Sequence, residues 1–147
     1  APWLATGFPL PLWKRAVRPL MLRVAPRLTI AAGLRGEHLT RDPERQADRA
    51  RDPAVHDRVS AGLAAQAEAA QRAALRGALP ANLPVLLIAP GDDPATQVSV
   101  AVDWVRGTDA SVTVAEVPHA RHEAHNDRGR EALFATLLDW LASHARD

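Results

Sequence analysis

Hydrophobic residues in the first half of the chain recur at helical spacing, three or four positions apart. Residues 10–24 place six apolar side chains on one face: Trp13, Ala16, Val17, Leu20, Met21 and Val24. This pattern predicts an amphipathic helix, which Pro19 should kink or shorten. A second apolar series over residues 55–70 predicts a long alanine-rich helix that ends before Gly77. Residues 25–43 contain two glycines and two prolines and indicate that the connection between the two helices is mostly loop.

The pattern changes in the second half of the chain. Residues 83–91, LPVLLIAPG, form a continuous apolar run bounded by a proline and a glycine, which is typical of a strand covered on both faces. A helical pattern over residues 96–105 and a valine-rich strand over residues 111–118 follow. Leucines at helical spacing then predict a terminal helix, with Asn126 or Asp127 as its N-cap. This order predicts a βαβ unit with parallel strands, so the fold class is α/β.

Polar loops follow both predicted strands: GDDPAT after the first and HARHEAHND after the second. The carboxyl ends of neighbouring parallel strands meet at one sheet edge, about 4.8 Å apart. Either aspartate of the first loop, Asp92 or Asp93, can therefore meet a histidine of the second loop: His119, His122 or His125. An acid that orients a histidine, in this chain order, forms the second and third members of a Ser-Asp-His triad.

The three histidines are open to two other interpretations. A loop with several histidines and acids is by default a solvated surface loop. Their spacing of three positions also allows a zinc site, although the loop contains His-Glu-x-His rather than the helical His-Glu-x-x-His that places two ligands on one face. The pattern alone leaves a catalytic base, a metal site and a solvated loop as alternatives.

Composition narrows the functional classes. With 147 residues, 47% of them apolar, the chain is one domain or a piece of one. The net charge is +1 and no basic block is present, so we expect no nucleic-acid partner. Cysteine is absent, which excludes disulfides, thiolate metal sites and a cysteine nucleophile. No apolar run approaches the ~20 residues of a membrane span and no leader sequence opens the chain, so we expect a cytoplasmic protein.

Several segments of the sequence are similar to segments of a known protein family. The segments LPVLLIAPGDD, HARHE and FATLLDWL together resemble the C-terminal part of α/β-hydrolases of the monoacylglycerol lipase and lysophospholipase (serine aminopeptidase-like) type. WKRAVRPLMLRVAPRLTIAAGL, HLTRDPE and DPAVHDRVS resemble the cap region of that family. The resemblance implies a partial α/β-hydrolase fold. Residues 1–80 would form a helical cap or lid, and residues 81–147 would supply the last two parallel strands and the C-terminal helix of the core.

By this resemblance, Asp93 falls on the triad aspartate of the family and His122 on its triad histidine. The chain departs from the family pattern at the strand end, where Ala89-Pro90 replaces the usual His-Gly, and after Asp93, where Pro94-Ala95-Thr96 replaces an apolar pair. Asp92 therefore competes with Asp93 for the role of the acid. The implied activity is hydrolysis of lipid-type carboxylic esters, such as monoacylglycerols or lysophospholipids, without a cofactor.

The nucleophile that the resemblance implies is not recognisable in the chain. The family places it in a Gly-x-Ser-x-Gly turn between a strand and a helix. None of the four serines lies in such a sequence: Ser60, Ser99, Ser111 and Ser143. We expect the serine and the oxyanion hole to precede Ala1, and the 147 residues alone to be inactive. The alternative is a non-catalytic hydrolase remnant or a binding module.

The helix predicted over residues 10–24 also has two interpretations. Its apolar stripe can pack against the rest of the protein, as most amphipathic helices do. With basic residues beside the stripe, it can instead rest on lipid substrate at a membrane or micelle surface.

Overall fold

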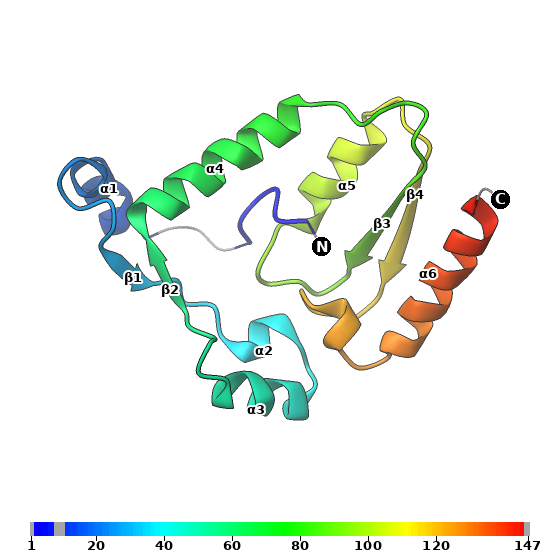
Figure 1. Cartoon of the computed structure of the whole chain (residues 1–147), viewed down its shortest axis with the longest axis horizontal. Coiled ribbons are helices and arrows are strands. Elements are labelled where there is room, and N and C mark those ends of the chain that lie inside the picture. The colour runs from blue at the N-terminus through cyan, green and yellow to red at the C-terminus, as the bar shows by residue number, and fades with distance from the viewer. Residues whose placement is uncertain (1, 8–10, 146–147) are drawn as a thin grey trace.

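The computed structural model describes residues 2–7 and 11–145 and contains two small sheets surrounded by helices (Figure 1). Its helices are α1 (Leu12–Val24), α2 (Gly36–Leu39), α3 (Pro43–Arg51), α4 (Ala61–Arg76), α5 (Val98–Arg106) and α6 (Arg130–His144), with a 3-10 turn η1 (Ala124–Asn126). Its strands are β1 (Thr29–Ala31), β2 (Arg58–Ser60), β3 (Val85–Pro90) and β4 (Val112–Val117). No helix in the described ranges is long and apolar enough to span a membrane.

The predicted βαβ unit is confirmed. Strands β3 and β4 pair in parallel, from Val85 opposite Val112 to Pro90 opposite Val117. Helices α5 and α6 lie on opposite sides of this sheet (Figure 1). Burial follows this layering, because one cluster gathers around Leu87, Ala101 and Val105 and another around Ala120, Ala124 and Leu133. The sheet therefore holds the loops after β3 and β4 at one edge.

Helix α4 begins later than its apolar spacing predicts. The predicted start near Val55 is wrong, because residues 58–60 form strand β2 and pair with β1. The Ser60 hydroxyl accepts a hydrogen bond from the backbone N–H of Leu63 at 3.1 Å and caps the helix. The end of α4 at Arg76, before Gly77, agrees with the prediction.

The connector predicted as a loop contains ordered elements. Strand β1 and helix α2 both fall within residues 25–43, whereas the rest of the connector up to Asp42 is loop or turn, as predicted. Helix α3 follows, with the Asp42 carboxylate accepting from the N–H of Glu44 at 2.9 Å and a proline at the first helical position. Asp-Pro is a recognised helix-start signal, so this helix was visible in the sequence.

Two further details correct the sequence prediction. Helix α1 runs through Pro19 to Val24, so the proline does not shorten it; Leu10, where the predicted helix began, lies outside the described residues. The N-cap of α6 is Gly129, in the left-handed region at φ +78°, rather than Asn126 or Asp127. The Asp127 carboxylate instead accepts hydrogen bonds from backbone N–H groups outside α6.

Candidate active site

The loops after β3 and β4 are joined by backbone hydrogen bonds. The N–H of Gly91 donates to the carbonyl of Val117 at 3.0 Å, and the N–H of Asp92 donates to the carbonyl of Ala120 at 3.0 Å. A Cβ atom at Gly91 would lie 3.3 Å from the backbone of Pro118 and His119. Glycine thus allows the two loops to approach this closely.

Asp93 and His122 meet across these loops. Oδ2 of Asp93 lies 2.9 Å from Nδ1 of His122, and the aspartate side chain is fully buried. The same carboxylate accepts from the Thr96 hydroxyl at 2.6 Å and from the N–H of Ala95 at 2.8 Å. Because the β3 loop supplies these local donors, the aspartate is held in one orientation toward the histidine.

The Asp93 carboxyl is ionised under ordinary conditions. Burial by itself raises its pKa, but hydrogen bonds from His122, Thr96 and Ala95, with the nearby imidazole charge, outweigh burial and hold the pKa below the ordinary 3.8. An ionised carboxylate only accepts hydrogen bonds, so Nδ1 of His122 carries the proton of this bond. In the neutral imidazole, Nε2 is then the basic nitrogen. No hydrogen bond to Nε2 forms among the described residues, and the His122 side chain is 24% exposed.

Asp92 lies in a different environment from its neighbour. Its carboxylate forms an ion pair with the guanidinium of Arg41, which also donates to the carbonyl of His119. The Asp92 side chain is 53% exposed. The two adjacent aspartates therefore have different partners, and only Asp93 contacts a histidine.

The other two histidines of the loop lie apart from this pair. His119 and His125 are both exposed, and His119 has a left-handed backbone at φ +64°. Over residues 2–7 and 11–145, no three His, Asp or Glu side chains gather closely enough to hold a metal ion. The structure thus does not assemble His119, His122 and His125 into the metal site that their spacing allowed.

The N-terminal segment supports the β3 loop from the other side. The N–H of Gly7 donates to the carbonyl of Ala95 at 2.9 Å, and the N–H of Gln97 donates to the carbonyl of Ala5 at 3.0 Å. Thr6 and Thr96 form an antiparallel bridge between these bonds. Residues far apart in the sequence thus fix the turn that carries Asp93.

Asp127 is a site residue whose role the sequence did not indicate. It is 1% exposed, and its carboxylate accepts backbone N–H bonds from Arg41, Arg121 and Arg128. One of these donors, Arg121, precedes His122 directly. A polar residue before a helix suggests an N-cap, and no local pattern points to a partner 86 positions away.

Within the described part of the chain, no hydrogen bond joins a serine to His122. Ser60 caps α4, and the hydroxyl of Ser143 contacts the carbonyl of Trp140 and the ring of His144 at the far end of α6. The pair of Asp93 and His122 therefore has no serine partner among these residues.

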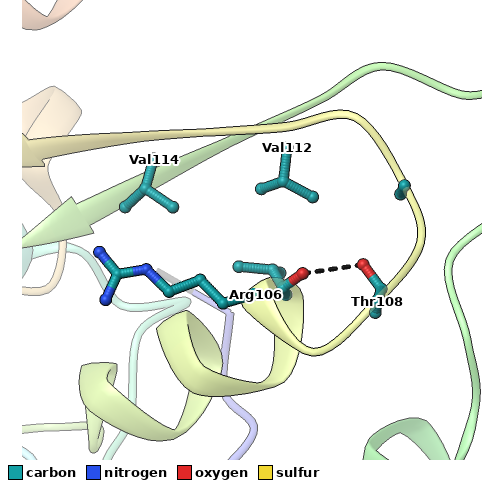
Figure 2. Close-up of a pocket in the computed structure, with 6 residues that line it drawn as sticks. Arg106, Thr108, Val112 and Val114 are labelled. Carbon is teal, nitrogen blue, oxygen red and sulfur yellow. Dashed lines mark hydrogen bonds between the residues drawn. The ribbon is translucent and has the colours of Figure 1, made fainter.

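A shallow pocket of about 410 Å³ lies away from the pair (Figure 2). It is formed by the end of α5 and the start of β4, and its lining residues are Val105, Arg106, Thr108, Ala110, Val112 and Val114. The pair lies at the carboxyl ends of β3 and β4, whereas this pocket borders the beginning of β4. Its only ionisable lining side chain is Arg106, so the pocket holds no acid–base pair.

Comparison with known proteins shows the family of the chain. A family model described as serine aminopeptidase, S33, matches residues 1–129. No curated protein gives a significant match.

The solved structures that resemble the chain include two lipases. Monoacylglycerol lipase from Paleococcus ferrophilus has a TM-score of 0.84 and 27% identity, over 98% of this chain and 57% of the lipase. A soluble variant of monoglyceride lipase from Saccharomyces cerevisiae, in complex with a substrate analog, has a TM-score of 0.74 and 20% identity, over 91% of this chain and 47% of the lipase. The chain spans about half the length of these structures. The chain belongs to the serine aminopeptidase S33 family and has a partial α/β-hydrolase fold.

Proposed function

We propose that the protein to which these residues belong hydrolyses carboxylic esters of lipid type, with His122 as general base and Asp93 as the acid that orients it. The observation that carries this proposal is the 2.9 Å hydrogen bond between a fully buried, ionised Asp93 and Nδ1 of a partly exposed His122. This arrangement leaves Nε2 to accept a proton from a nucleophile. The family assignment and the two lipase structures support a hydrolase of this class.

In the proposed mechanism, Nε2 of His122 takes the proton of a serine hydroxyl as the serine attacks the ester carbonyl. The imidazolium then gives this proton to the leaving alcohol, and a second cycle with water releases the acid. The Asp93 carboxylate keeps the proton on Nδ1 and stabilises the imidazolium that forms. No step of this mechanism requires a cofactor.

The nucleophile of this proposal lies outside the 147 residues, together with the oxyanion hole. None of the four serines occurs in a Gly-x-Ser-x-Gly sequence. We expect these 147 residues by themselves to hydrolyse no ester. The Asp93–His122 pair is thus two members of a triad whose third member comes from elsewhere in the protein.

We propose monoacylglycerols or lysophospholipids as substrates and residues 1–80 as a cap over the site. The surface of helix α1 favours a lipid substrate, because Leu12, Trp13 and Leu20 are 79%, 62% and 61% exposed. Lys14, Arg15 and Arg18 lie within the same helix, and such an amphipathic surface suits the interface of a membrane or micelle.

The test is to express the complete reading frame and treat it with a fluorophosphonate, which reacts with an activated serine. We expect covalent labelling of one serine, hydrolysis of monoacylglycerol, and loss of both in His122→Ala. The matched control is His125→Ala, which changes an exposed histidine of the same loop. The absence of any nucleophile elbow in the complete frame, with no labelling, would favour the second candidate, a non-catalytic remnant or binding module.

A further inference from the structure

The carboxylate of Asp127 joins three separate parts of the chain. Oδ1 accepts from the N–H of Arg41 at 2.7 Å and of Arg128 at 2.9 Å, whereas Oδ2 accepts from the N–H of Arg121 at 2.7 Å. Only 1% of the residue is exposed. A buried carboxylate with three backbone donors is strongly held, because each of these bonds is charge-assisted.

These contacts form part of a continuous seam between residues 39–41 and the histidine loop. The N–H of Glu123 donates to the carbonyl of Leu39 at 2.8 Å, and the hydroxyl of Thr40 donates to the carbonyl of Asn126 at 2.9 Å. Arg41 adds its ion pair with Asp92 from the other loop. Residues 39–41 therefore bind Glu123, Asn126 and Asp127 of the 121–127 loop, and His122 lies inside this loop.

The Asp127 side chain does not serve helix α6. An N-cap aspartate would accept from N–H groups in the first helical turn, yet no such bond forms and Gly129 occupies the cap position. The bond from Oδ2 instead reaches backward to Arg121, the residue before His122. The carboxylate thus stabilises the position of the histidine loop rather than the start of the helix.

We propose that Asp127 is a positioning residue for His122, holding the 121–127 loop on residues 39–41 so that Nδ1 of His122 stays within hydrogen-bonding distance of Asp93. This inference deepens the proposed function and rests on it. Asp127 is too engaged with backbone donors to contact substrate, and its influence passes through the bond to Arg121. It also links the histidine to the segment before α3, so a shift of that segment would reach the Asp93–His122 pair.

The substitution Asp127→Asn tests this role in the protein expressed from its complete reading frame. An asparagine offers one oxygen and one NH2 group, and keeping the oxygen at the Oδ1 position retains the bonds from Arg41 and Arg128. The NH2 group then faces the backbone N–H of Arg121. Two donors cannot form a hydrogen bond, so the backbone of Arg121 moves away. We expect kcat for ester hydrolysis to fall about 10²-fold, the loss that a displacement of about 1 Å causes, with KM little changed.

A second measurement reports on the pair without catalysis. The Nδ1 proton of His122, bonded to Asp93, gives a low-field proton NMR resonance, and we expect Asp127→Asn to weaken or remove it. The matched control is Asp42→Asn, which also replaces a carboxylate that accepts a backbone N–H. The Asp42 carboxylate contacts Arg130 but not the 121–127 loop. The control should keep both the resonance and kcat.

The outcomes separate the two proposals. If the resonance disappears in Asp127→Asn and the parent protein hydrolyses no ester, the positioning role stands and the proposed function fails. If the resonance and kcat per folded molecule both persist, Asp127 has only a structural role and the inference is wrong.

A milder pair of variants covers the case in which Asp127→Asn does not fold. Thr40→Val removes the hydroxyl that donates to Asn126 and contacts Asp127, whereas Thr40→Ser restores it. We expect a weakened resonance and a lower kcat in the valine variant and recovery of both in the serine variant. Equal values in the two variants would contradict the proposal.

Discussion

The Asp93 carboxylate lies 2.9 Å from Nδ1 of His122, although 29 positions separate the two residues in the chain. Two parallel strands bring them together, because β3 and β4 end at the same edge of their sheet. The adjacent Asp92 takes Arg41 as its partner instead.

Replacing His122 should have a far larger effect than replacing its neighbours. We expect His122→Ala to lower kcat for ester hydrolysis by about 10²–10⁴-fold or more, the share of a general base. His125→Ala should cost little, since that side chain is exposed. His119→Asn should also cost little, because asparagine tolerates the left-handed backbone of this position. Equal losses at the three histidines, measured as kcat/KM, would contradict the proposed pair.

The two adjacent aspartates should differ in the same assay. Asp93→Asn removes the charge that stabilises the imidazolium and favours the wrong tautomer of His122, so we expect kcat to fall by up to about 10⁴-fold. Asp92→Asn weakens a half-exposed ion pair with Arg41 and should change kcat much less. The reverse order of effects would assign the acid to Asp92.

Asp127 should contribute to stability in a pH-dependent way. Burial raises the pKa of its carboxyl, but hydrogen bonds from the N–H groups of Arg121, Arg41 and Arg128 and from the Thr40 hydroxyl outweigh it and hold the pKa below 3.8. A lowered folded-state pKa stabilises the protein above the unfolded value, and this contribution is lost as the pH falls through the folded pKa.

We therefore expect Asp127→Asn to reduce the free energy of unfolding by about 1–3 kcal/mol at pH 7. The difference from wild type should shrink as the pH falls below about 4, where the carboxyl of the unfolded chain becomes protonated, and should vanish once the pH is below the lowered pKa of the folded state. Denaturant titrations at a series of pH values measure this. A difference that stays constant down to pH 2 would show that the charge of Asp127 is not involved.

Helix α1 should affect lipid substrates selectively. Replacing its exposed apolar residues, as in Leu20→Ser or Trp13→Ser, should lower turnover of long-chain or aggregated esters more than of short soluble ones, because only the former meet an interfacial helix. Leu83→Ser is the control, because Leu83 is also more than half exposed but lies outside α1. A uniform loss on both substrate classes would indicate that α1 has a packing role instead.

Gly7 should be intolerant of a side chain. A Cβ atom there would lie 2.5 Å from the carbonyl oxygen of Pro94, in the turn that carries Asp93. We expect Gly7→Ala to cost about 1–3 kcal/mol of stability, as overpacking does, and to lower kcat by shifting that turn. Gly36→Ala is the matched control, since its Cβ would meet neighbours at an ordinary 3.6 Å. Melting temperatures of the two variants measure the difference.

The sequence by itself determined the elements whose stability is local. A continuous apolar run indicated β3, a valine-rich stretch indicated β4, and helical periodicity indicated α1, α5 and α6. The polar loops after both strands identified the edge where Asp93 and His122 meet. These features are readable because hydrophobic periodicity reflects which side chains the element itself must bury. The resemblance to the family favoured Asp93 over Asp92 as the triad aspartate before any contact was known.

Only the tertiary structure decided the features that depend on distant partners. Residues 58–60 form strand β2 instead of the predicted start of α4, because residues 29–31 pair with them. Asp92 pairs with Arg41, 51 positions earlier in the chain, rather than with His122, because the guanidinium supplies an opposite charge. Asp127 does not cap α6, because its carboxylate is bonded to three backbone N–H groups, one of them from a residue 86 positions away. A local propensity is worth about 1 kcal/mol, so the hydrogen bonds and ion pairs of a folded chain readily override it.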